Sequence, residues 1–163
     1  MKIKVCGITR EEDIAELLLA GVDFIGFNFI KSSPRYIDIN WAVNIINKYN
    51  IQKKVVPLCE IRDLKTLHHK LKNLDLPFYQ IYKVHDSSNQ IEKFNLNYFL
   101  PTSATKLKQN IDNNLFIDNK DKYLLDNFDH GLGGSGIKFN WNDLANIKLD
   151  NCMIAGGIEI KDL

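Results

Sequence analysis

Two residues suited to proton transfer lie at the ends of apolar runs. Cys6 follows Val5 in the segment KVCGIT, just before a glycine, and Asp126 follows two leucines in the segment LLD. A thiol with a lowered pKa can act as a base or nucleophile, and a partly buried carboxyl group keeps its proton and can act as a general acid. The ordinary alternatives are a small buried hydrophobic residue for Cys6 and a helix cap or turn residue for Asp126.

An arginine and two glycine-rich turns could hold anionic groups. Arg35 follows Pro34 in SSPRY, where a guanidinium group could pair bidentately with a carboxylate or phosphate, although a solvated loop arginine is equally compatible. GLGGSG (131–136) and AGG (155–157) each follow an apolar run, so backbone N–H groups there could approach an anion closely. GLGGSG is not GxGxxG and follows a late strand, which argues against a dinucleotide site. Two such turns after successive late strands favour a phosphate site.

Composition and charge exclude several classes of function. The 163 residues are enough for one domain with one core, and a formal net charge of +1 creates no field that would attract nucleic acid or an anionic membrane. Three scattered cysteines without a CxxC pair, and four histidines without ligand spacing, predict neither a disulfide framework nor a metal site. The N-terminus lacks an apolar signal segment, and no run approaches the ~20 apolar residues of a membrane span. We therefore expect a cytoplasmic protein.

Short β-type runs alternate with helical patterns along the chain. The expected strands are 3–8, 23–29, 54–59, 77–84, 97–102, 122–126 and 151–158, and the expected helices are one after Thr9 and others at 41–50, 63–74, 88–94, 103–112 and 141–147. Thr9 is expected to cap the first helix, with Glu12 completing a capping box, and Gly21 is expected to end it.

Seven βα repeats without hairpin signals predict parallel strands joined by helical crossovers. Both an open doubly wound sheet and a closed barrel fit this pattern, and the spacing alone does not decide between them. No linker or low-complexity segment interrupts the chain, so we expect a single domain over residues 1–163.

The order and spacing of these motifs resemble the phosphoribosylanthranilate isomerase family. The matching segments are KVCGIT, GVDFIGFNF, SSPRYI, LLD, GGSGIKFNW and IAGGI, within residues 2–42 and 122–158. The resemblance implies an α/β fold of the TIM (β/α)8-barrel type and a small phosphorylated substrate, an aminated ribose phosphate of tryptophan biosynthesis. Ser135 replaces the more usual threonine, which is a conservative difference.

The resemblance also implies a role for each candidate residue. Asp126 would protonate the ribose ring oxygen as general acid, and Cys6 would remove the proton from the sugar C2 as general base, in an Amadori rearrangement. Arg35 would hold the anthranilate end. The phosphate would be held by the backbone amides of Gly134, Ser135, Gly156 and Gly157. No metal or organic cofactor would be needed, because the imine itself is the electron sink.

The chain also departs from the family pattern. The fourth strand of the family normally ends in Gln-Leu-His-Gly, whereas here the sequence is Gln80-Ile81-Tyr82-Lys83. The chain stops at Leu163, whereas the family continues with an eighth strand and its phosphate turn, so we expect about seven βα units in an incomplete, C-terminally truncated barrel. Its first and seventh strands would leave a gap and invite aggregation or pairing with another chain, for example in a homo-oligomer. Alone, the chain is expected to be poorly soluble or oligomeric, and inactive.

Two other interpretations remain open. The chain could be a non-catalytic remnant that keeps the motifs by descent. It could also be another sugar-phosphate barrel enzyme, such as indole-glycerol-phosphate synthase. The synthase needs catalytic Lys and Glu residues at strand ends, and the contexts of Lys4 and Glu60 do not match it. The isomerase is therefore the favoured interpretation, and the remnant is the runner-up.

Overall fold

The structure is a computed structural model that describes residues 2–82, 91–112, 122–127, 138, 140, 142, 152–159 and 161. The chain divides into two compact units, Met1–Tyr98 and Phe99–Leu163. Within the described ranges, no helix combines the length and the apolar character needed to cross a membrane.

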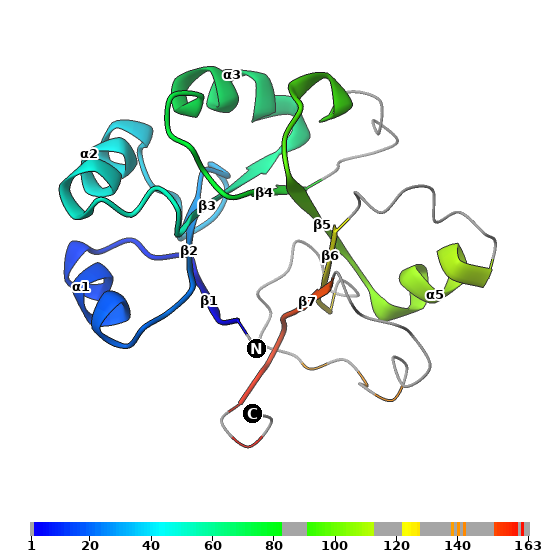
Figure 1. Ribbon diagram of the computed structural model, residues 1–163. Helices are drawn as coiled ribbons and strands as arrows, with labels where there is room; N and C mark the ends of the chain where they lie inside the picture. Colours follow the sequence, from blue (N-terminus) through cyan, green and yellow to red (C-terminus); the bar gives the residue numbers. More distant parts are fainter. Residues whose placement is uncertain are drawn as a thin grey trace. The chain divides into compact units, whose positions relative to one another are not determined.

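The first unit alternates strands with helices. Its strands are β1 (Lys4–Cys6), β2 (Phe24–Asn28), β3 (Val55–Glu60) and β4 (Tyr79–Tyr82), and its helices are α1 (Glu11–Leu19), α2 (Ile39–Tyr49), α3 (Ile61–Leu71) and the 3-10 helix η1 (Glu92–Phe94). Successive strands pair in parallel, which confirms the arrangement predicted from the βα repeats. Figure 1 shows α1, α2 and α3, coloured blue to green, along one side of these strands.

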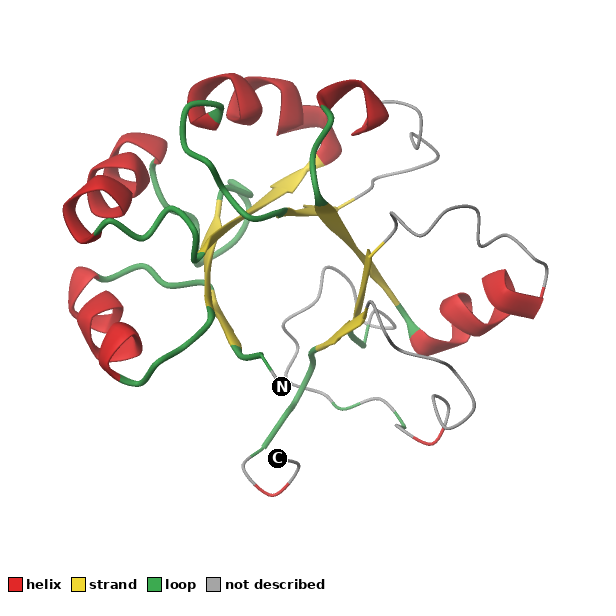
Figure 2. Cartoon of the chain, in the orientation of Figure 1, coloured by secondary structure: helices red, strands yellow, loops and turns green. Residues whose placement is uncertain are grey.

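Strand register sorts the side chains of the first unit onto two faces. On the helix-covered face, Phe27 packs on Trp41 of α2 with ring centroids 5.8 Å apart. The strand residues that alternate with Phe27 and its register neighbours are on the other side, because successive side chains of a strand point to opposite faces. We call this side the helix-free face; it carries Cys6, Gly26, Asn28, Leu58, Glu60, Gln80 and Tyr82. In Figure 2 the strands of this unit (yellow) curve with the helices (red) on their outer side.

The ends of helix α1 test two predictions. The predicted capping box at Thr9 is wrong, because the N-cap residue is Arg10, which makes no side-chain capping hydrogen bond. Arg10 instead forms an ion pair with Asp13, and the acidic first turn supplies the negative charge that a helix N-terminus favours. The predicted end is confirmed: Gly21 has a φ of 72° and its N–H donates to the carbonyl oxygen of Leu18.

The second unit is built in the same way. It contains β5 (Tyr98–Thr102), whose first residue ends the first unit, followed by α5 (Ala104–Asp112), β6 (Lys122–Leu125) and β7 (Cys152–Ile154). The pairs β5–β6 and β6–β7 are parallel. Leu125 packs with Ala104 and Leu107 of α5 in a small core. Only Asn142 of the helix predicted at 141–147 is described, and the glycine-rich segment 131–136 lies outside the described residues. The gap expected between the first and seventh strands stays a prediction.

Candidate active site

Cys6 is the last residue of β1 and lies at the carboxyl end of the parallel strands, as predicted. Its thiol is free and half-buried. Its register partner on β2 is Gly26. A Cβ atom on Gly26 would lie only 2.8 Å from the Cys6 Sγ, so the thiol rests against the bare backbone of β2. Cys6 is therefore held at a strand end on the helix-free face, with part of its surface open to solvent.

A hydrogen-bonded loop after β2 carries Arg35. The Asn28 side chain accepts from the N–H of Ile30 at 2.9 Å and donates to the Ser33 Oγ at 2.9 Å. The same Ser33 Oγ accepts from the N–H of Arg35 at 3.2 Å. Sequence reasoning missed both Asn28 and Ser33. The signal was an asparagine at the end of an apolar strand, followed within one short loop by the Ser-Pro-Arg segment, because Asn and Ser side chains commonly bond to nearby backbone groups.

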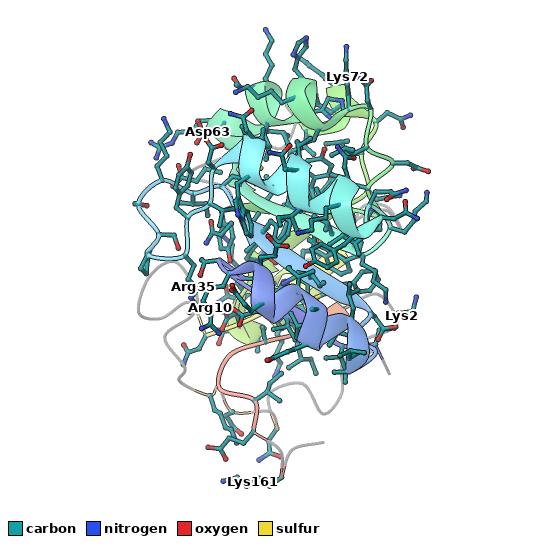
Figure 3. The ribbon with its side chains drawn as sticks, turned by 90° about the vertical axis from the view of Figure 1, so that its left-hand side faces the viewer. Lys2, Arg10, Arg35, Asp63, Lys72 and Lys161 are labelled. Atoms are coloured by element: carbon teal, nitrogen blue, oxygen red, sulfur yellow. The ribbon has the colours of Figure 1, made fainter. Side chains whose placement is uncertain are left out.

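Arg35 and Cys6 come together through Gly7. Gly7 follows Cys6 directly and has a φ of 79°. A Cβ atom on Gly7 would overlap with the Arg35 Cδ and lie 3.1 Å from its Nη1, so the arginine side chain crosses the Gly7 backbone. Figure 3 shows Arg35 and Lys2, which precedes β1, at opposite ends of this unit. The structure thus places Arg35 against the residue that follows Cys6.

Asp126 directly follows β6 and is 5% exposed. Its N–H donates to the Thr102 carbonyl oxygen at 3.1 Å, and its Oδ1 accepts from the N–H of Asn127 at 2.8 Å. Because Leu125 packs on α5, strand alternation directs the next side chain to the face away from that helix. The arrangement is a buried carboxyl group with a fixed backbone at a strand end, which suits proton transfer.

The glycine turn after β7 lies beside Asp126 in the second unit. The N–H of Ala155 donates to the Leu125 carbonyl oxygen at 2.7 Å, which fixes the turn next to the end of β6. Gly156 and Gly157 have φ values of 86° and 63°, which residues with a side chain rarely adopt. Neither glycine N–H donates to another described residue, so both remain available to an anion.

The structure does not test the other predictions made for the site. Gly134 and Ser135 lie outside the described residues. The predicted convergence of Asp126 with Cys6 and Arg35 involves both units and stays a prediction.

Polar side chains on β3 and β4 were not predicted to belong to the site. Gln80 is 3% exposed, and its Nε2 donates to the Tyr82 Oη at 2.7 Å. The Gln80 Oε1 is buried and has no hydrogen-bond partner among the described residues. Glu60, at the end of β3, is also buried and pairs with Arg62. The helix-free face is thus polar at its carboxyl end, where the fourth strand departs from the family pattern.

The other two cysteines are structural. Cys59 is fully buried, and burial raises its pKa to about 12, with the nearby charges of Asp63 and Glu60 acting in the same direction. Burial also raises the pKa of the Cys152 thiol, against a hydrogen bond from the Tyr123 backbone. Both thiols are therefore poor nucleophiles at neutral pH. In the described part of the chain, no group of three or more side chains has the composition of a metal site.

Comparison with known proteins gives a consistent family. The family model of N-(5'phosphoribosyl)anthranilate (PRA) isomerase matches residues 3–163. The tryptophan biosynthesis protein TrpCF of Buchnera aphidicola subsp. Baizongia pistaciae is 36% identical over 98% of this chain, and the chain spans 34% of that protein's length. The N-(5'-phosphoribosyl)anthranilate isomerase of Clostridium acetobutylicum is 30% identical over 100% of this chain, which covers 80% of that enzyme.

Two solved structures share the fold. Phosphoribosyl anthranilate isomerase from Thermotoga maritima is 20% identical with a TM-score of 0.74, and the match covers 97% of this chain and 78% of that one. A structure of the isomerase in complex with reduced 1-(o-carboxyphenylamino)-1-deoxyribulose 5-phosphate is 18% identical with a TM-score of 0.70, over 97% and 76% of the two chains. These matches confirm the predicted α/β fold of the (β/α)8-barrel type, with seven strands among the described residues. The chain therefore belongs to the N-(5'-phosphoribosyl)anthranilate isomerase family.

Proposed function

We propose that the chain converts N-(5'-phosphoribosyl)anthranilate to 1-(2-carboxyphenylamino)-1-deoxyribulose 5-phosphate, an Amadori rearrangement in tryptophan biosynthesis. Family membership over residues 3–163 supports this reaction. So does the solved relative that holds a reduced form of the same product. The observation that carries the proposal is that Cys6 and Asp126 each lie at the carboxyl end of a strand, on the face away from the helices.

The proposed reaction needs one acid and one base. The Asp126 carboxyl group gives its proton to the ribose ring oxygen as the bond from C1 to that oxygen breaks, which leaves a protonated imine at C1. The Cys6 thiolate then removes the proton from C2, and the electrons of that bond reduce the imine to an enolamine. Return of a proton to C1 and loss of the hydroxyl proton at C2 give the ketone. Electrons balance within the substrate, so the proposal includes no metal or organic cofactor.

Binding in this proposal uses the two ends of the substrate. Arg35 pairs with the anthranilate carboxylate, supported by the exposure of this residue and by its position against Gly7, which follows Cys6. The phosphate is held by backbone N–H groups of Gly134, Ser135, Gly156 and Gly157. The left-handed backbone of Gly156 and Gly157, with both N–H groups available, supports the second half of that assignment.

The proposal extends to the compartment and the partners of the protein. Three free cysteines suit a reducing cytoplasm. We propose a single phosphate-binding barrel domain whose partners are its small-molecule substrate and a second copy of the chain, in a homo-oligomer, rather than nucleic acid or a membrane.

Turnover by the purified, folded protein tests the proposal against the expectation from the sequence that the chain alone is inactive. The protein is incubated with N-(5'-phosphoribosyl)anthranilate, and product is measured by chromatography and mass spectrometry. We expect the dephosphorylated substrate to react about 10²-fold more slowly or worse, because two lost charge-assisted hydrogen bonds are worth ~1.5–3 kcal/mol each. Failure of the folded protein to form any product would instead favour the non-catalytic remnant.

Ser33→Ala tests whether the loop after β2 supports Arg35. The substitution removes the oxygen that accepts from both Asn28 and Arg35, so the loop loses two restraints. We expect KM to rise about tenfold, equivalent to ~1.4 kcal/mol of binding, with a much smaller change in kcat. Ser32→Ala is the matched control, because the neighbouring Ser32 is exposed and accepts neither bond. An equal KM in the two variants would show that the loop bonds do not position Arg35.

A further inference from the structure

Gly26 lies directly against the proposed base. A Cβ atom at this position would lie 2.8 Å from the Sγ, 3.0 Å from the Cα and 3.2 Å from the Cβ of Cys6, whereas ordinary contacts begin at 3.4 Å. These are the three nearest atoms, and all belong to Cys6. The space that the missing side chain leaves on β2 is therefore filled by the cysteine.

Gly7 has the same relation to Arg35. The three nearest atoms to a Cβ at Gly7 are the Cδ, the Nη1 at 3.1 Å and the Cβ at 3.4 Å of that arginine. Since the overlapping group is a flexible side chain in an exposed loop, a methyl group on Gly7 would displace the arginine rather than disrupt the strands.

Gly21 offers a natural comparison. Its φ of 72° is close to the 79° of Gly7, so a side chain at either position carries similar backbone strain. A Cβ atom on Gly21, however, would meet nothing within 4 Å. Substitution at Gly21 therefore reports strain alone, and substitution at Gly7 reports strain together with displacement of the arginine.

We propose that Gly26 and Gly7 are positioning residues, with Gly26 fixing the Cys6 thiol and Gly7 fixing the Arg35 guanidinium group at the reacting end of the substrate. This inference rests on the proposed functions of Cys6 and Arg35. The two glycines act on different groups, so their substitutions should affect different kinetic constants. A side chain on Gly26 would misplace the base, and one on Gly7 would misplace the group that binds the substrate carboxylate.

The kinetic test compares three alanine variants. In Gly26→Ala the thiol must move by about 0.6 Å or more to reach the ordinary 3.4 Å contact, and kcat should fall by about 10²-fold with KM little changed, because misplacement by ~1 Å can cost that much. In Gly7→Ala, KM should rise about tenfold with a smaller change in kcat. Gly21→Ala should leave both constants within about twofold of wild type. The same loss in all three variants, following their stability, would overturn the proposal.

A second readout does not depend on turnover. The rate at which iodoacetamide modifies Cys6 is followed by peptide mass spectrometry, with Cys59 as internal control because burial raises its pKa to about 12. Gly26→Ala should change the Cys6 rate by roughly threefold or more, since that rate depends on thiol access and ionisation. Gly21→Ala should leave it unchanged. If the wild-type protein proves inactive, the proposed reaction fails while this measurement still decides whether Gly26 positions the thiol.

A variant that fails to fold would not end the test. In Cys6→Ala/Gly26→Ala the Sγ is absent, so part of the close contact is relieved. Urea unfolding of this double variant should show higher stability than Gly26→Ala alone. An equal or lower stability of the double variant, or an unchanged Cys6 modification rate in folded Gly26→Ala, contradicts the proposed contact.

Discussion

Cys6→Ser should lower kcat by about 10²–10⁴-fold, the usual contribution of a general base, while leaving KM close to wild type. A serine hydroxyl ionises far less readily than a thiol and is therefore a much poorer base for the C2 proton. The exchange is nearly isosteric at a half-buried position, so the fold should be retained. Steady-state kinetics with purified protein, together with a thermal unfolding curve, separate loss of the base from loss of structure.

Cys152→Ser is the matched control for this variant. Cys152 is also a half-buried strand residue, but it packs against the small core under α5. Its substitution should cost some stability and leave turnover nearly intact. Wild-type turnover in Cys6→Ser, or an equal loss in Cys152→Ser, would remove Cys6 from the proposed mechanism.

The periodicity of the sequence was sufficient to predict the strands. Six expected runs each contain one strand, and the run 54–59 covers all of β3 except its last residue, Glu60. Strands with buried faces leave a continuous apolar signal. Helix starts were less predictable. Helix α2 begins at Ile39, earlier than expected, because the Asp38 side chain accepts from two N–H groups of the first turn. At α1 the local Thr-x-x-Glu pattern was misleading. The helix begins at Glu11 with Arg10 as its N-cap residue, and Arg10 pairs with Asp13.

The candidate site was only partly predictable for a different reason. Cys6 and Asp126 could be found because each ends an apolar run, and that signal is local. The contact between Gly26 and Cys6 depends on the register of β1 against β2. That of Gly7 with Arg35 depends on the path of the loop after β2. Neither the strand register nor the loop path can be predicted from the spacing of residues along one segment.

The face that the polar side chains of β4 occupy was also not predictable from the sequence. Gln80 and Tyr82 alternate with Ile81, so the sequence indicates that they share a face but not which face. The contact of Tyr79 with His68 of α3 decides this, because it assigns Tyr79 and Ile81 to the helix-covered side. Gln80 and Tyr82 are thereby directed to the helix-free face, where their hydrogen bond forms.

Asp126→Asn is expected to lower kcat by about 10²–10⁴-fold, because an amide cannot donate an acidic proton to the ring oxygen. The amide oxygen can still accept from the N–H of Asn127, so the local structure should persist. A thermal unfolding curve of the variant separates loss of the acid from loss of structure. Asp38→Asn is the matched control, because asparagine caps a helix about as well as aspartate. Near-wild-type turnover in Asp126→Asn, or an equal loss in Asp38→Asn, would assign the acid to another group.

Combining the two catalytic substitutions tests the order of the steps. In the proposed mechanism Asp126 acts when the ring opens, and Cys6 acts at the later loss of the C2 proton. The two substitutions therefore raise two successive barriers, and the higher barrier alone sets kcat/KM. The double variant Cys6→Ser/Asp126→Asn should then be about as slow as the slower single variant. Losses that multiply in the double variant would mean that both residues act in one transition state, and the stepwise mechanism through a separate imine would have to be abandoned.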